Sequence, residues 1–139
     1  MSLDAASPSP SRGRIIGIGG VFFKSDNPTA LTEWYCKHLG FCNDPQTGIS
    51  FPWRTADNDA SHRTVWAVFP SDTKYFEPSE SQHLINYIVD DLDAFLARVR
   101  DEGVQIHPHQ QTDPAGRFAW IFDADGNKIE LWEPAKLQP

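Results

Sequence analysis

The stretch FAWIFDADGNKIELWEP, residues 118–134, predicts two antiparallel strands joined by a tight turn. Residues 118–122 and 128–132 are rich in aromatic and β-branched side chains, which favour strands. Between them, Asp125-Gly126 is a dipeptide that favours a two-residue hairpin turn. This hairpin is the most specific structural signal in the chain, and the rest of the fold is interpreted outward from it.

A strand, a helix and a short strand are predicted before the hairpin. Residues 84–89 have the composition of a strand, and Asp90-Asp91 caps a helix whose apolar positions recur at helical spacing over residues 91–102. Gly103 is typical of a helix end, and residues 104–106 predict the next strand. The His107-Pro108-His109 step then indicates a surface loop, because a zinc site needs more ligands than two histidines.

The first half of the chain repeats this order with little residue identity. Residues 14–23 predict a strand, Asn27 and Pro28 begin a helix over residues 28–39, and Gly40 ends it. Residues 48–54 and 63–69 predict two further strands, and the polar segment 70–81 separates the halves. We therefore expect a disordered tail at 1–13 and a single domain over 14–139, with similar modules at about 14–78 and 82–134.

The composition excludes several classes of partner. A net charge of -7 and a pI near 5.0 leave no basic surface for nucleic acid. No apolar run is long enough to cross a membrane, and the first residues lack the apolar core of a signal peptide. We expect a cytoplasmic protein whose two cysteines are reduced.

Three stretches resemble vicinal-oxygen-chelate proteins, the glyoxalase, bleomycin-resistance and extradiol-dioxygenase superfamily. They are GGVFFKSDNPTALTEWYCKHLGF (19–41), NYIVDDLDAFLARVRDEGV (86–104) and the terminal hairpin. The resemblance implies an α+β fold in which two βαβββ modules form a curved, open, barrel-like mixed sheet around a central cleft. It also implies a homodimer.

The same resemblance allows the metal-binding positions of the family to be checked. Metal-using members place one ligand on the first and one on the last strand of each module, commonly His, Gln or Glu. The first position falls on Gly20, the second on Phe69 or Pro70, and the third on Leu84, none of which can bind a cation. His83 is adjacent but points to the opposite face of a regular strand. Only Glu130 matches, so we expect no metal cofactor, although a divalent metal remains an alternative.

Glu130 is the candidate catalytic residue. A carboxylate on a strand is ordinarily a surface group. Here, however, Ile129 and Leu131 make one face of the strand apolar, which leaves Glu130 and Trp132 on the opposite, concave face. Partial burial would raise its pKa and suit it to accept a proton or to anchor a ligand.

The strands also supply candidate ligand-binding residues, mainly aromatic. An aromatic cleft with few polar groups is typical of small-molecule sites, although each of these side chains is equally suited to the core. Asn86 offers a hydrogen bond, and Arg54 can pair with an anionic ligand or with Glu130, or remain solvated. The predicted set is Phe22, Trp53, Arg54, Trp66, Asn86 and Trp132.

Three functions are considered. The first is a binding protein that holds a small aromatic or heterocyclic compound in a largely metal-free cleft. The second is a metal-dependent glyoxalase-type lyase or isomerase, or a dioxygenase, that uses Glu130 and His83. Metal-free proton transfer by Glu130 is a third, for which the sequence names no oxyanion stabiliser. The missing metal ligands favour the first.

Overall fold

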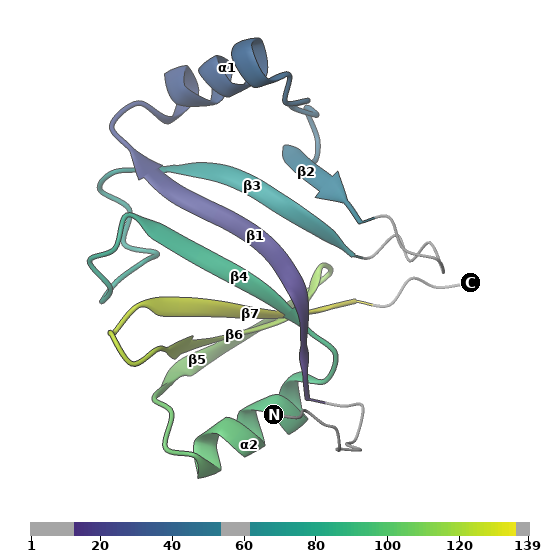
Figure 1. Cartoon of the computed structure of the whole chain (residues 1–139), viewed down its shortest axis with the longest axis vertical. Helices are drawn as coiled ribbons and strands as arrows, with labels where there is room; N and C mark the ends of the chain where they lie inside the picture. The colour runs from purple at the N-terminus through teal and green to yellow at the C-terminus, as the bar shows by residue number, and fades with distance from the viewer. Residues whose placement is uncertain (1–12, 54–61, 136–139) are drawn as a thin grey trace, which may run out of the picture.

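One curved, mixed sheet carries two helices in this computed structural model, which describes residues 13–53 and 62–135 (Figure 1). The predicted tail and Arg54 lie outside the described residues, apart from Gly13, whose carbonyl accepts a hydrogen bond from Arg98. No helix of the described part is long and apolar enough to cross a membrane. The elements are β1 (Ile15–Ser25), α1 (Pro28–Leu39), β2 (Ile49–Pro52), β3 (Arg63–Pro70), β4 (His83–Val89), α2 (Leu92–Asp101), β5 (Ile106–Asp113), β6 (Gly116–Phe122) and β7 (Lys128–Pro134).

The strand order β2-β3-β1-β4-β7-β6-β5 divides the sheet into two related halves. In each half the first strand pairs in parallel with the last, β1 with β3 and β4 with β7. The halves join through the antiparallel pair β1 and β4 at the centre of the sheet. The predicted α+β class, with an open and curved mixed sheet, is confirmed.

The first half has one strand fewer than the βαβββ pattern expected from the family. In the second half β5 follows α2, whereas the described chain after α1 forms a compact turn before β2. The Asp44 carboxylate accepts hydrogen bonds from the backbone N–H groups of Gln46 and Thr47, and Gly48 has a φ of 75°. This Asp-Pro turn uses backbone groups that an additional strand would need for pairing.

The helix limits agree with the sequence prediction, whereas β5 is longer than predicted. Asn27 and Asp91 each accept a hydrogen bond from a backbone N–H in the first helical turn. His107 and His109 belong to β5 and not to a loop. The strand lies at the sheet edge and pairs with β6 alone, so Pro108 and polar side chains are tolerated there.

Each helix covers its own half of the sheet, but only α2 builds a buried core. Four side chains of α2 are buried, and they pack against alternate residues of β4, β6 and β7, whereas none of the residues of α1 is buried. The alternate residues that face away from α2 therefore form the opposite face of these three strands. The core cluster consists of Val89, Leu92, Phe95, Leu96, Val99, Ala119, Ile121 and Leu131.

This difference predicts unequal stability of the two helices. Leu96 is 3% exposed, and Leu96→Ala is expected to lower the free energy of unfolding by about 2–5 kcal/mol because it opens a cavity. Leu39 of α1 is 54% exposed, and the same substitution there should cost less than about 1 kcal/mol. Urea unfolding of both variants measures the difference. Equal losses would contradict the asymmetry.

Candidate functional site

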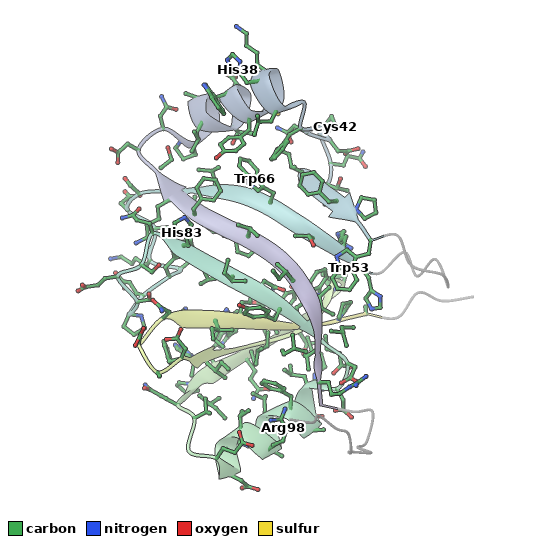
Figure 2. All side chains as sticks on the ribbon, in the orientation of Figure 1. His38, Cys42, Trp53, Trp66, His83 and Arg98 are labelled. Carbon is green, nitrogen blue, oxygen red and sulfur yellow. The ribbon has the colours of Figure 1, made fainter. Side chains whose placement is uncertain are left out.

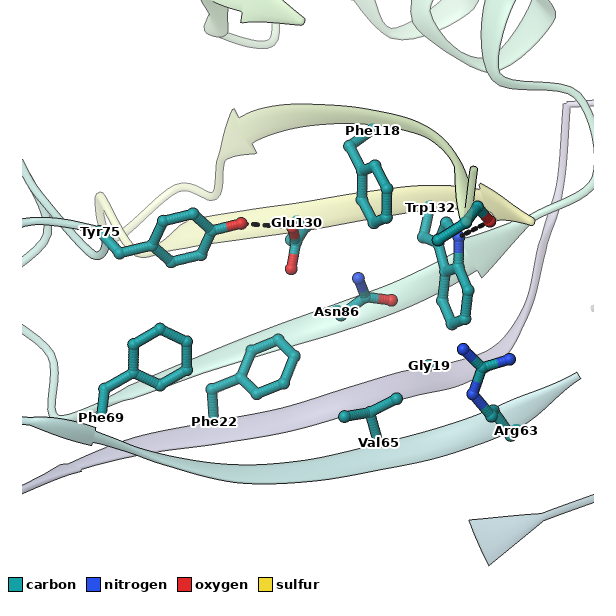
Figure 3. A pocket seen from close by; sticks show the side chains of 11 residues that line it. Gly19, Phe22, Arg63, Val65, Phe69, Tyr75, Asn86, Phe118, Glu130 and Trp132 are labelled. Carbon is teal, nitrogen blue, oxygen red and sulfur yellow. Dashed lines mark hydrogen bonds between the residues drawn. The ribbon is translucent and has the colours of Figure 1, made fainter. Parts of the chain in front are cut away.

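A cavity of about 300 Å3 opens on the face of the sheet opposite α2 (Figure 3). Its residues come from both halves of the sheet, from the β5–β6 turn and from the segment between β3 and β4. This volume is at the lower end of the range for small-molecule sites. The lining residues are Gly19, Phe22, Arg63, Val65, Phe69, Tyr75, Asn86, Ala115, Phe118, Glu130 and Trp132.

Glu130 is the buried acid of this cavity. Its side chain belongs to β7 and is 5% exposed. The Tyr75 hydroxyl donates a 2.5 Å hydrogen bond to Glu130 Oε2. Asn86, 2% exposed, lies in register with Glu130 on the neighbouring strand β4. Two strands and the inter-module segment therefore bring three polar groups together.

Burial and charge shift the pKa values of this group. Burial raises the pKa of Glu130 above its ordinary value, and the negative charge of Asp113 adds to the rise. Hydrogen bonds from Tyr75 and Asn86 and the positive charge of Lys128 act in the opposite direction but are smaller. Burial and the nearby Glu130 charge raise the pKa of Tyr75, so its hydroxyl keeps its proton. Burial also lowers the pKa of Lys128.

Asn86 carries a buried acceptor that lacks a partner. Within the described chain, Asn86 Oδ1 makes no hydrogen bond. Figure 3 shows the amide nitrogen on the side of Glu130 and the oxygen on the side of Trp132. A Cβ at Gly19 would come within 2.4 Å of this oxygen and 2.9 Å of the Trp132 ring. Because Gly19 has no side chain, Asn86 and Trp132 can pack directly against its backbone.

Aromatic rings form the walls of the cavity. Phe118 and Trp132 stack with their ring centroids 5.9 Å apart, and the Trp132 indole N–H donates to the Ala115 carbonyl. On the other side, Phe69 lies between the rings of Phe22 and Tyr75, with centroid distances of 5.5 and 5.6 Å. A flat, apolar ligand would contact rings on both sides.

Comparison with known proteins gives the family. Residues 17–131 match the model of the Glyoxalase/Bleomycin resistance protein/Dioxygenase superfamily. The chain belongs to this superfamily. No curated protein sequence matched it.

Solved structures with this fold include proteins of different activity. A Streptomyces coelicolor methylmalonyl-CoA epimerase variant in complex with 2-nitronate-propionyl-CoA is 18% identical, with a TM-score of 0.64 over 88% of this chain and 99% of that chain. The Mycobacterium tuberculosis methylmalonyl-CoA epimerase is 23% identical, with a TM-score of 0.58 over 91% and 93%. A structure described as a NAD-dependent benzaldehyde dehydrogenase from Legionella pneumophila is 17% identical, with a TM-score of 0.54 over 84% and 98%. These likenesses concern the fold.

Four of the residues predicted from the sequence line the cavity: Phe22, Asn86, Glu130 and Trp132. Trp66 does not. Its ring packs against Phe23, Tyr35 and Phe41, on the side of the sheet that α1 covers (Figure 2). Side chains of β3 alternate between faces, and Val65 occupies the cavity side next to it.

Trp53 also lies away from the residues that line the cavity (Figure 2). Its indole N–H donates to the Thr64 hydroxyl, and its ring is near His62. The ring also fills the space beside Gly17, where a Cβ would come within 2.2 Å of it. Trp53 therefore packs across β3 and β1.

The strand register shows which residues lie beside Glu130 across the centre of the sheet. Asn86, and not Leu84, pairs with both Gly20 and Glu130, and Val65, and not Phe69 or Pro70, pairs with Gly20. The four central positions are thus Gly20, Val65, Asn86 and Glu130. One carboxylate and one amide do not make a transition-metal site. Within residues 13–53 and 62–135, no three His, Cys, Asp or Glu side chains are grouped closely enough to hold a metal ion.

His83 does not supply a further ligand to the cavity. It pairs with Phe23, one residue away from the cavity-facing Phe22, and its ring lies 5.9 Å from the Phe23 ring. This is the face opposite Glu130, as the regular strand alternation predicts. The residues of this family member therefore do not fit a tightly held cation.

Sequence reasoning missed two polar residues of the cavity. Tyr75 lies in the polar segment that was interpreted as a linker, and Arg63 begins β3. The Lys74-Tyr75-Phe76 step, two aromatic residues in an otherwise polar segment, was the available signal for Tyr75. Phe76 is fully buried and fixes the segment against the sheet. No sequence signal distinguished Arg63 from a solvated strand-end arginine.

The raised pKa of Glu130 predicts a pH-dependent stability difference. A carboxyl whose pKa is higher in the folded than in the unfolded state stabilises the fold below its ordinary pKa of about 4.5, and this contribution is lost as the pH rises through the folded pKa. Glu130→Gln cannot ionise. Relative to wild type, the variant should therefore become more stable between pH 4 and pH 8.

Thermal unfolding across this pH range measures the effect. Subtracting the wild-type curve removes the contributions of Asp44, Asp93 and Asp123, whose lowered pKa values act in the opposite direction. Glu33→Gln, the same substitution at an exposed position of α1, gives the baseline. A difference that stays constant with pH, or that favours wild type at high pH, would contradict the raised pKa.

Proposed function

We propose that this protein binds a small, planar aromatic or heterocyclic compound in the cavity. The observation that carries the proposal is the buried Asn86 Oδ1 without a partner, beside an acid within aromatic walls. Leaving a buried acceptor unsatisfied costs roughly 1–3 kcal/mol. Such a group in a cavity wall suits a ligand that carries an N–H or O–H donor.

Glu130 gives this site both recognition and the capacity for proton transfer. Its Oε2 accepts from Tyr75, which holds the carboxyl in place at the cavity. A carboxyl with a raised pKa exchanges a proton at a pH nearer neutrality than an exposed one does. We assign Glu130 as the residue that anchors the ligand and, if the ligand reacts, accepts its proton.

The metal-dependent alternative is a lyase, isomerase or dioxygenase reaction with Glu130 and His83 as ligands. The related structures include methylmalonyl-CoA epimerases, several of them in complex with a CoA compound. The donor set in this chain disagrees with a metal reaction, because His83 lies on the other face and the remaining central positions hold Gly20, Val65 and Asn86. We therefore propose binding without a resident metal.

Aromatic walls predict which substitution weakens binding. Phe118→Ala removes the ring that stacks on Trp132, and the affinity for planar compounds should fall about 3–10-fold. Phe51→Ala removes a ring that is 44% exposed and outside the cavity, and should leave the affinity unchanged. A thermal-shift screen of planar aromatic compounds identifies binders, and calorimetry compares the variants. If no such compound raises the melting temperature, the proposal is wrong.

The metal question is decided by elemental analysis of purified protein. After mild dialysis we expect no stoichiometric Zn, Ni, Mn or Fe, because one carboxylate holds such ions weakly. The control is Glu33→Ala, which removes an exposed carboxylate of α1. One metal per chain that is lost in Glu130→Ala and kept in Glu33→Ala would establish the metal-dependent alternative instead.

We also propose that the protein is a homodimer. Three apolar residues of β1 are exposed: Ile15 at 41%, Ile16 at 37% and Ile18 at 45%. Packing of a second copy against β1 would reduce this exposed apolar area. The single domain over residues 14–139 and the cytoplasmic location remain predictions from the sequence.

A further inference from the structure

We propose that the ligand is an acid, a planar aromatic compound whose anionic group binds Arg63 while its hydrogen-bond donor faces Asn86 and Glu130. This rests on the proposed function and adds to it the charge and the orientation of the ligand. The carrying observation is a guanidinium without a carboxylate partner in the described part of the chain, at the aromatic wall of the cavity.

Among the described residues, Arg63 contacts an aromatic ring and forms no ion pair with an acid. Its Cζ lies 5.2 Å from the centre of the Trp132 ring, and the side chain is half-buried. By contrast, Arg98 and Arg117 of the second half each pair with a carboxylate. The distance from Arg117 Nη2 to Asp93 Oδ1 is 2.7 Å. Stacking uses the face of a guanidinium and leaves the N–H groups at its edge available. A planar carboxylate is the group that matches such an edge.

The other polar groups of the cavity fix the direction of the ligand. Asn86 Oδ1 and the Glu130 carboxylate are acceptors, so an anionic group next to them would be repelled. Figure 3 shows Arg63 beside Trp132 at one end of the cavity, and Tyr75 and Phe69 at the other. The acid group therefore belongs at the Arg63 end, and the donor belongs near Asn86 and Glu130.

The net charge of the chain implies that any preference for an acidic ligand comes from the cavity and not from the surface as a whole. With a net charge of -7, the surface as a whole repels anions. Selective binding of an acid over its neutral analogue would thus come from a local cation. Arg63 is the arginine among the residues that line the cavity.

The experiment uses matched pairs of compounds of nearly the same shape, one anionic and one neutral. The probes are 4-hydroxybenzoate and 6-hydroxy-2-naphthoate, each compared with its primary amide, by calorimetry on the full chain. We expect wild type to bind the acids about 10-fold or more tightly than the amides, the effect of a charge-assisted hydrogen bond. Arg63→Gln should reduce this preference to less than about 3-fold, mainly by weakening the acids.

Two further variants separate recognition from stability. Arg63→Lys keeps the charge but loses the planar fork, and should give an intermediate preference. Arg100→Gln removes an exposed arginine of α2 and should leave the preference unchanged. Thermal unfolding of each variant without ligand shows whether it is folded. If Arg63→Gln is not folded, the acid preference of wild type is compared with that of Arg63→Lys instead.

The outcomes distinguish this inference from the proposed function. If amides bind as tightly as acids, or if the acid preference survives in both Arg63 variants, the assignment of Arg63 is overturned and the aromatic-binding function stands. If neither acids nor amides bind, both are overturned. Acid preference that depends on Arg63 supports both.

Discussion

The antiparallel pairing of β1 with β4 is the constraint on which the site depends. It places Gly20 opposite Asn86, and the parallel neighbours then bring Val65 beside Gly20 and Glu130 beside Asn86. Because side chains alternate along a strand, a shift of one residue in the β4–β7 ladder would turn Glu130 toward α2 and Leu131 toward the cavity. The hydrophobic core under α2 therefore protects the register, since such a slip would bury a carboxylate among apolar side chains.

The burial of Glu130 is tolerated because a few polar groups next to its carboxyl offset the loss of water. Tyr75 donates to Glu130, Asn86 lies beside it, and the Lys128 ammonium is close enough to favour the charged form. Aromatic rings occupy the remaining directions, so water reaches the carboxyl poorly and its pKa stays raised. The same arrangement leaves Asn86 Oδ1 unsatisfied. A buried acid beside an acceptor without a protein partner costs stability, which supports the proposal that the site serves a ligand.

The sequence predicts the local elements well and the long-range register poorly. The helix over residues 28–39 has its cap, its Pro and its terminal Gly within the segment itself, so its limits agree with the structure. The alternation in KIELW likewise places Glu130 on the cavity side. By contrast, the partner of Glu130 on β4 depends on pairing across the sheet, and β1 shifts register between Ile18 and Gly20. Counting along the chain therefore could not identify Asn86 as the neighbour of Glu130, and it did not reveal that Trp66 packs on the face of β3 opposite the cavity.

The two modules share a topology but contribute unequally to the site. The second supplies Asn86 and Glu130, whereas the residues of the first that lie in register with them are Gly20 and Val65. A transition-metal site generally takes at least three protein ligands, and at these positions the first module offers only a glycine and a valine. The first module contributes its polar group elsewhere, through Arg63 at the start of β3. The cavity therefore has acceptors, Asn86 and Glu130, between its ends and a cation, Arg63, at one end (Figure 3). This distribution of polar groups is the reason that we propose an asymmetric organic ligand and not a metal ion.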